Sequence, residues 1–257
     1  MIFSMKNNEL RNLLRHCVQP ICFGRVILFL FQRAWYSFQY RYTPAMWQYP
    51  KAVREAYKNV IVRSKQGKRR LDVVARNDGA AGRLKLAAGF LEYDGEPDWH
   101  KQFDDPEQTM SLHRWGWLIY DHMEKEQGLA LIRSWLSVMG SMSKGIAGTP
   151  YTTSERVVNA LLFLVPHPTL SHGERGWGEE IPIDLRAVLL TMAYHVAHNI
   201  EYHSVRGTGN HVVNNARALF FAGQVLGVKE LSTLALAVLK DALPWLVTKD
   251  GFLREES

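Results

Sequence analysis

A helical repeat of apolar residues runs through the C-terminal half of this 257-residue chain and restricts the folds it can adopt. Between residues 111 and 247, apolar side chains recur at positions i, i+3 and i+4, the spacing that gives a helix one apolar face. The connections between these segments are mostly short, which favours antiparallel helical hairpins. The expected helices cover residues 111–124, 127–139, 152–164, 184–203, 210–226 and 229–247. We therefore expect a mainly α fold.

The chain divides at residue 98 into an N-terminal segment and a helical domain. Residues 1–98 predict a small irregular part with one or two short strands within 83–93. Helices are expected there at 7–17, 25–39 and 51–64. The domain 99–257 contains a Gly- and Pro-rich stretch, 166–180, that interrupts two helical patterns, and we interpret it as a loop insertion. A long surface loop adds little closure entropy, so the fold tolerates such an insertion.

Positive charge is concentrated in the N-terminal segment. Residues 1–76 contain 15 Lys and Arg against 3 Asp and Glu, a net charge of +12, whereas the whole chain carries +6. A basic run such as 64–70 (SKQGKRR) favours an acidic partner, a polyanionic sugar, an anionic lipid or a nucleic acid, although any one such run is more often a solvated charged surface. No zinc-finger spacing, RNA-binding signature or P-loop accompanies it, so we expect no nucleic-acid partner.

Two further features of this segment indicate what the chain lacks. Cys17 and Cys22 are the only cysteines, too few for a disulfide framework or, by themselves, a metal site. The apolar run 26–31 (VILFLF) is too short to span a bilayer, so we expect no transmembrane segment. The residues after it include Gln32, Arg33 and Trp35 and offer no clear signal-peptide cleavage site. We interpret 25–40 as an amphipathic or buried helix, with a poorly formed signal sequence as the alternative.

The strongest candidate for a functional site is the stretch 201–223 (EYHSVRGTGNHVVNNARALFFAG), a polar loop that leads into a helix. Amides, imidazoles and a guanidinium surround two glycines there, and a helix N-terminus attracts anions. Asn210 is expected to cap the helix through its side-chain oxygen. The alternative is a well-capped helix that follows a solvated loop. The polar residues are Tyr202, His203, Arg206, Asn210, His211, Asn214 and Asn215.

Together with three other segments, this stretch resembles the heparinase II/III family of polysaccharide lyases. Its GNH triplet (209–211) is similar to the family's Asn-His motif, and GTPYTTSERVVNALLFL (148–164) resembles a Pro-Tyr-x-x-Ser-x-Arg-x-x-Asn helix start. The remaining segments, in the family's order, are PDWHKQF (97–103) with LHRWGWLIYD (112–121), and DGFLREES (250–257). The resemblance runs from about residue 89 to the end. It implies an incomplete α/α toroid of antiparallel helical hairpins, without the family's C-terminal β-sandwich.

The resemblance also implies an activity, the cleavage of an acidic, uronic-acid-containing polysaccharide by β-elimination. The Asn-His pair of the family lies at its catalytic centre, which assigns catalytic roles to Asn210 and His211. Asn210 donates hydrogen bonds without titrating, and His211 can act as a donor or a base. The family's catalytic tyrosine follows an Asp-Gly segment and has no counterpart after Asp250. We therefore expect a truncated form with little or no activity alone, and a separately encoded C-terminal lyase portion as a partner. Tyr151 and Tyr202 are alternatives, but nothing in the sequence assigns them this role.

Further residues are candidates for sugar binding. Arg156 and Asn159 are three residues apart on one helix face and are expected to line an acidic-sugar groove. The alternative for this helix start is capping by Thr152 or Thr153 together with a surface ion pair. The complete expected substrate-binding set is Tyr151, Arg156, Asn159, Tyr202, His203, Arg206 and Asn214. Trp99, Trp115 and Trp117 are expected in the core rather than on sugar rings, and His195 and His198 as satisfied polar groups on one helix face.

Two other functions remain open at this point. One is a non-catalytic carbohydrate-binding remnant of the same fold, and the other is a basic surface that binds a membrane or a nucleic acid. We expect no cofactor and no metal requirement. The family resemblance implies a periplasmic or cell-envelope protein, while the sequence itself leaves the compartment undecided.

Overall fold

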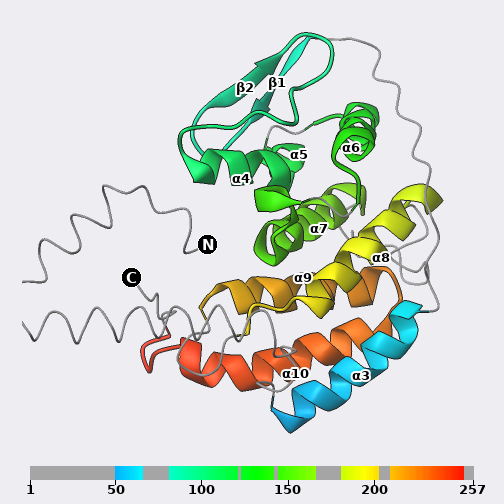
Figure 1. Ribbon diagram of the computed structural model, residues 1–257, viewed down its shortest axis with the longest axis vertical. Helices are drawn as coiled ribbons and strands as arrows, with labels where there is room; N and C mark the ends of the chain where they lie inside the picture. The colour runs from blue at the N-terminus through cyan, green and yellow to red at the C-terminus, as the bar shows by residue number, and fades with distance from the viewer. Residues whose placement is uncertain are drawn as a thin grey trace, which may run out of the picture. The chain divides into compact units, whose positions relative to one another are not determined.

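The computed structural model describes residues 50–65, 81–120, 123–141, 144–165, 181–202 and 209–251. All of them belong to one compact unit, Gln48–Ser257. This unit is mainly helical and includes one two-stranded sheet, which confirms the predicted fold class at this level (Figure 1). The predicted helices at 7–17 and 25–39, the apolar run 26–31, both cysteines and the insertion 166–180 lie outside the described residues.

The short strands predicted within 83–93 form an antiparallel hairpin. Strand β1 (Gly82–Lys85) pairs with β2 (Phe90–Tyr93), and Leu84 lies opposite Leu91. These two leucines are buried and their neighbours in each strand are more exposed, so the hairpin turns one apolar face inward. The hairpin is joined to the helices by a hydrogen bond from the Ala87 N–H to the Ser111 hydroxyl, 2.8 Å long.

The helix predicted at 111–124 is instead two helices. Helix α4 (Pro106–Arg114) starts earlier because the Asp105 carboxylate accepts the Glu107 N–H at 2.8 Å and Pro106 occupies the first turn. It ends at Trp115, which has a left-handed backbone with φ 59°. Helix α5 (Trp117–Tyr120) begins immediately after this turn. A single residue in the left-handed region therefore breaks an otherwise continuous apolar pattern.

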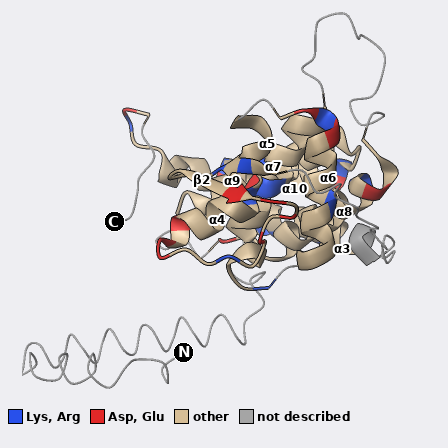
Figure 2. Ribbon diagram, turned by 90° about the horizontal axis from the view of Figure 1, so that it is seen from above, with Lys and Arg blue, Asp and Glu red and all other residues tan. Residues whose placement is uncertain are grey.

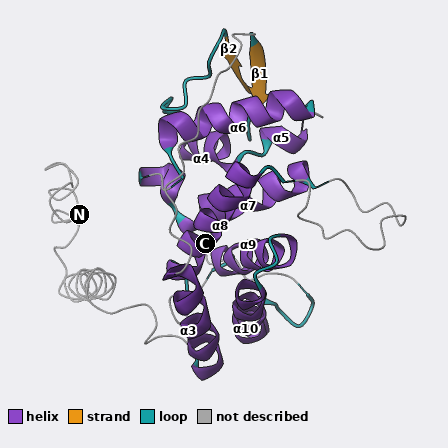
Figure 3. Cartoon of the chain, turned by 90° about the vertical axis from the view of Figure 1, so that its right-hand side faces the viewer, coloured by secondary structure: helices purple, strands orange, loops and turns teal. Residues whose placement is uncertain are grey.

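Helix α7 (Pro150–Leu164) lies at the centre of the unit. It contacts α4, α5, α8 (Ile183–His198) and α9 (His211–Val225), and most of its residues are buried. Before it come α6 (Lys125–Met139) and a short 3-10 turn, η3 (Gly145–Gly148). Figures 1 and 3 show the hairpin and α4–α6 on one side of α7, with α9 on the other.

Helix α8 is shorter than predicted. It ends at His198 rather than at 203, because Asn199 leaves the helical conformation (φ −130°, ψ 33°) and its side-chain amide donates to the His195 carbonyl at 2.8 Å. That bond satisfies a carbonyl of the last turn, which would otherwise lack an intrahelical partner. The start of the candidate site, Glu201 and Tyr202, therefore lies outside α8.

Helices α9 and α10 (Lys229–Leu246) form a closely packed pair. They are connected through Gly227, which adopts a positive φ of 68°. Within α9, Gly223 allows the approach, because a Cβ there would lie 2.6 Å from the Ser232 backbone nitrogen. Helix α3 (Lys51–Lys65), predicted at 51–64, packs on α10 and buries Val53, Tyr57 and Val60. Within the described ranges, every helix is too short or too polar to cross a membrane.

Candidate functional site

Helix α9 begins at the predicted site, but Asn210 does not cap it through its side chain. Asn210 has a helical backbone (φ −60°, ψ −21°), whereas a capping side chain needs an extended one to reach the first-turn N–H groups. The carbonyls of Gly209 and Asn210 accept those N–H groups from Val212, Val213 and Asn214 instead. The predicted cap is therefore wrong, and the Asn210 amide has no hydrogen-bond partner among the described residues.

His211 lies in the first turn of α9 and contacts residues from two other segments. Its ring stacks on Tyr151 of α7, with centroids 4.1 Å apart and planes 12° apart. Its Nδ1 is 3.2 Å from Oε1 of Glu201, in the chain that leads from α8. The side chain is 48% exposed and can therefore reach a ligand in solvent. The structure thus brings together two predicted site residues, Tyr151 and His211, that come from separate motifs.

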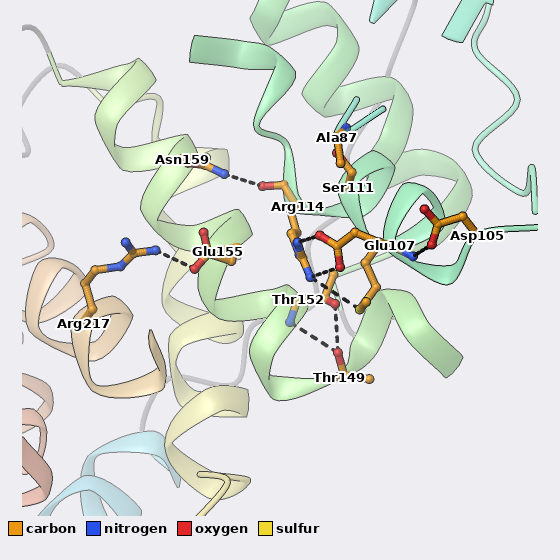
Figure 4. Close-up of polar contacts among 11 residues, drawn as sticks. Ala87, Asp105, Glu107, Ser111, Arg114, Thr149, Thr152, Glu155, Asn159 and Arg217 are labelled. Atoms are coloured by element: carbon orange, nitrogen blue, oxygen red, sulfur yellow. Dashed lines mark hydrogen bonds and ion pairs between the residues drawn. The ribbon is translucent and has the colours of Figure 1, made fainter. Parts of the chain in front are cut away.

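The other contact of the Tyr151 ring is a cation. The Arg114 guanidinium carbon, at the end of α4, lies 4.6 Å from the Tyr151 ring centroid, within the range of a cation–π interaction. Arg114 also forms a two-pronged ion pair with Glu107 (Figure 4). Burial raises the pKa of Tyr151, and nearby Arg114 opposes that shift. The Tyr151 hydroxyl has no hydrogen-bond partner within the described part of the chain.

A second ion pair connects α7 with α9 beside this stack. Arg217 donates to the Glu155 carboxylate, and their side chains are 43% and 19% exposed (Figure 4). Figure 2 shows acidic and basic residues together near the α7 and α9 labels. The surface around Tyr151 and His211 is therefore rich in charge of both signs, and Arg217 is its most accessible cation among the side chains described in these pairs.

Arg156 and Asn159 share one face of α7, as predicted, but that face points into the protein. Arg156 is 1% exposed, and its guanidinium donates to the His113 carbonyl (2.7 Å) and to the Ala147 carbonyl. Asn159 is 7% exposed and donates to the Arg114 carbonyl at 2.9 Å (Figure 4). Together they satisfy the last carbonyls of α4, and we call these two residues and the α4 end the arginine junction. It leaves no room for the predicted sugar contact from Arg156.

The alternative expected for this helix start is wrong in its cap, and the surface ion pair found there joins Glu155 to Arg217 and does not include Arg156. Thr149 is the N-cap of α7, and its hydroxyl oxygen accepts the Thr152 N–H at 3.3 Å. The positive charge of Arg156 is instead held among aromatic rings, 4.1 Å from the centroid of Trp135 and 5.6 Å from that of Trp115. Burial lowers the Arg156 pKa to about 9.

One of the predicted core tryptophans, Trp115, lies beside Arg156 in this junction. Trp99, Trp115 and Trp117 are each at most 1% exposed, which confirms that they belong to the core. Trp99 stacks near Trp117 with centroids 5.9 Å apart, and Trp115 meets Trp135 edge-on at 5.1 Å. Stacking on sugar rings would require an exposed face, and these rings have none.

Tyr202 points away from the stack. It is 4% exposed, and its hydroxyl donates to the Asp241 carboxylate of α10 at 2.6 Å. Burial raises the Tyr202 pKa, and the bond to Asp241 adds to that shift. Asn214 is one turn after His211 on α9 and is half-buried. His203 and Arg206 lie outside the described residues.

His195 and His198 both have hydrogen-bond partners, as expected. His195 Nε2 lies 2.9 Å from the Gly148 carbonyl, immediately before α7. His198 Nδ1 lies 2.9 Å from the Tyr57 hydroxyl of α3. Burial lowers the pKa of His198, with a smaller contribution from nearby His195. The two histidines therefore connect α8 to different neighbours.

Sequence reasoning missed the residues that surround the stack. Glu201 belongs to the singled-out stretch, but its position ten residues before His211 gives no sign of contact, because the two residues do not share a helix. Arg114 lies within the 112–121 segment, and only the ending of α4 at Trp115 brings it to Tyr151. No group of three or more His, Cys, Asp or Glu side chains in the described ranges is arranged to hold a metal ion.

Comparisons with protein-family models, with curated proteins and with solved structures find no match to this chain.

Proposed function

We propose that this chain is a polysaccharide lyase domain similar to those of the heparinase II/III family, acting on an acidic polysaccharide that contains uronic acid. The observation that supports it most is the contact between Tyr151 and His211. Each residue was selected from a different family-like motif, and the two rings stack 4.1 Å apart on the surface of adjoining helices. Two polar residues without a shared role would have no reason to lie in contact, so the stack supports a common site.

In this proposal the helices form part of an α/α toroid of antiparallel hairpins. The pairing of α7 with α8 and of α9 with α10 supports it, because consecutive helices that pack together are the unit of such a fold. The turn at Gly227 is short enough to reverse the chain between α9 and α10. The Tyr151–His211 stack then lies where two hairpins meet.

The reaction removes the proton at C5 of a uronate, forms a C4=C5 double bond and breaks the C4–O bond. His211 is the base in this scheme, since its exposed ring can reach a substrate proton and an unprotonated imidazole nitrogen can accept it. Asn210 stabilises the charge that develops on the uronate carboxylate, and its amide is free to donate among the described residues. The leaving oxygen takes a proton from an acid.

Tyr151 is the better candidate for that acid. It contacts His211 directly, and its hydroxyl has no partner among the described residues, whereas the Tyr202 hydroxyl is committed to Asp241. Arg114 beside the ring stabilises a phenolate, the form that Tyr151 takes after it gives up its proton. Arg217 and Asn214 lie on the same helix as His211, and in this scheme they bind neighbouring acidic groups, Arg217 by giving up its bond to Glu155.

The test uses the full chain with a panel of uronate polymers and a neutral glucan. Turnover is followed by the ultraviolet absorbance of the C4=C5 product. Binding is measured beside turnover, at low and high salt. We expect acidic polymers to bind and salt to weaken the binding, since it depends on opposite charges. His211→Ala and Asn210→Ala should each lower any turnover by about 10²–10³-fold.

His100→Ala is the matched control, because His100 is exposed and lies in the loop before α4. It should behave as the unchanged protein in both measurements. Binding of acidic polymers without any turnover would favour the carbohydrate-binding alternative. Failure to bind any acidic polymer, or unchanged turnover in both site variants, would rule out the proposed site.

A further inference from the structure

We infer that Glu201 is a positioning residue that holds the His211 ring in the tautomer with its proton on Nδ1. Nε2 then carries the lone pair and faces the ligand. The catalytic importance of this role rests on the proposed function. The tautomer itself is a property of the protein without substrate. Glu201 and His211 come from different segments, the residues that follow α8 and the first turn of α9.

The contact has the geometry of a carboxylate that orients an imidazole. Oε1 of Glu201 lies 3.2 Å from Nδ1 of His211, within hydrogen-bond distance. An ionised carboxylate only accepts hydrogen bonds, so the proton of a neutral His211 is held on Nδ1. Nε2 has no partner among the described residues, and the ring is 48% exposed. The nitrogen that remains open is therefore the one that can accept a proton from a substrate.

Glu201 is itself held in place by Asn215. The Asn215 side chain is fully buried, and its oxygen accepts the Glu201 backbone N–H at 2.8 Å. Its amide nitrogen is 3.4 Å from Oε2, the carboxylate oxygen that does not face His211. Asn215 thus forms hydrogen bonds with both the backbone and the side chain of Glu201. This arrangement fixes the direction of the carboxylate far better than a single surface contact would.

The same amide also connects this pair to the helix that carries Tyr151. Asn215 donates to the Ser154 hydroxyl at 3.0 Å, and Ser154 in turn donates to the Pro150 carbonyl at 2.8 Å. Ser154 is fully buried. Both hydrogens of the Asn215 amide are therefore used, one toward Ser154 and one toward Glu201. The orientation of Glu201 is set by the start of α7, the same turn that sets the Tyr151 ring.

The His211 ring is consequently restrained in two independent ways. Stacking on Tyr151 restricts the plane of the ring, and the bond to Glu201 fixes which nitrogen is protonated. A histidine held in this way can act as a base without first having to change its tautomer. Loss of Glu201 leaves the plane restrained and frees the tautomer, so the two contributions can be separated by experiment.

The experiment is nitrogen NMR of the full chain labelled with ¹⁵N-histidine, at a pH where the imidazoles are neutral. Loss of signals in His211→Gln assigns the resonances. We expect Nδ1 of His211 to have the chemical shift of a protonated nitrogen and Nε2 that of an unprotonated one. Glu201→Ala should shift His211 toward the Nε2–H form preferred by a free histidine. Glu201→Gln keeps a carbonyl oxygen that accepts from Nδ1–H and should retain the original tautomer.

Glu155→Ala is the matched control, since Glu155 is a partly buried glutamate near the stack that pairs with Arg217 instead of His211. It should leave the His211 tautomer unchanged. Where uronide formation is measurable, Glu201→Ala should lower kcat by up to about 10²-fold with little change in KM. A His211 tautomer that is the same in Glu201→Ala and in the unchanged chain would overturn the positioning role. Failure of the chain to bind any acidic polymer, with the expected tautomers, would count against the proposed function and leave this role intact.

Discussion

Helix α7 supplies polar residues to two regions that differ in burial and in hydrogen bonding. At the arginine junction, Arg156 and Asn159 are buried and their hydrogen bonds end on the carbonyls of α4. Tyr151 lies more than one turn earlier on the same helix and stacks on His211 of α9. Both rings of this stack are partly exposed. The Tyr151 hydroxyl and His211 Nε2 lack partners among the described residues.

The difference shows what separates a structural polar residue from a site residue. Burial without a partner is costly, so buried donors are positioned to satisfy particular acceptors and have no capacity left for a ligand. An exposed group is solvated by water and can exchange that water for a substrate at little cost. The junction should therefore control the stability of the fold, and the stack should control binding and turnover with little influence on stability.

Arg156→Ala should have the largest effect on stability. The change leaves the His113 and Ala147 carbonyls without their donor and opens a cavity beside Trp135. We expect a loss of about 3–5 kcal/mol in the free energy of unfolding, measured by urea denaturation. Arg217→Ala, which removes an arginine that is 43% exposed, should cost less than about 1 kcal/mol. A loss below 1 kcal/mol for Arg156→Ala would show that the junction does not support the fold.

His113 should make the junction sensitive to acid. Burial, with a smaller contribution from Arg156, lowers the pKa of His113 to about 4, and its Nδ1 accepts the Trp135 indole N–H at 3.2 Å. The unfolded chain therefore binds this proton at a higher pH than the folded one does. Stability is unaffected by this group above about pH 6.5 and falls by about 3 kcal/mol as the pH drops from 6.5 to 4.

The measurement is the free energy of unfolding at a series of pH values. In His113→Asn the side-chain oxygen can still accept from Trp135, but nothing titrates at that position. The variant should therefore lose much of the decline between pH 6.5 and 4. An identical decline in both proteins would assign the acid sensitivity to other groups.

Tyr202→Phe should have an intermediate effect. It removes the hydroxyl that donates to Asp241 and leaves the ring in place, so we expect a loss of about 1–2 kcal/mol in the free energy of unfolding. Polysaccharide binding should be unchanged in conditions where the protein remains folded, because this side chain is buried. A selective loss of binding with normal stability would instead place Tyr202 in the site.

Tyr151→Phe should have the smallest effect on stability. The phenyl ring keeps the stack on His211, and the lost hydroxyl has no partner among the described residues. The free energy of unfolding should change by less than about 0.5 kcal/mol. Any turnover should fall sharply if Tyr151 is the acid. A stability loss above 1 kcal/mol in thermal or urea unfolding would mean that the stack is part of the scaffold after all.

Periodicity predicted the helices well and their irregularities poorly. The start of α10 and the ends of α6 and α7 agree with expectation, because capping and apolar spacing are local properties. The break at Trp115 could not be predicted, since a left-handed tryptophan is stabilised by packing against Trp117 and Trp135 rather than by its own preference. The end of α8 at His198 was visible only in hindsight from the Asn199 side chain.

The candidate site was predicted in part. Tyr151 and His211 were both selected from motif patterns, and their contact with each other was not predicted. The i, i+3 spacing placed Arg156 and Asn159 on one face correctly but could not tell which neighbour that face meets. Only the tertiary packing of α4 on α7 decides this question. The contact of Glu201 with His211 was not predicted, because no helical period relates residues that belong to different elements.

Arg114 belongs to both regions at once. Its backbone carbonyl accepts the Asn159 amide in the core, while its guanidinium lies over Tyr151 at the surface. The Arg114 side chain is only 15% exposed, so a shift in the backbone at the end of α4 moves the cation that lies over the ring. Substitutions at Asn159 and at His211 should consequently be non-additive, with a coupling free energy of about 0.5 kcal/mol or more, although the two residues have no bond between them. Arg114 thus belongs to the scaffold through its backbone carbonyl and to the site through its guanidinium.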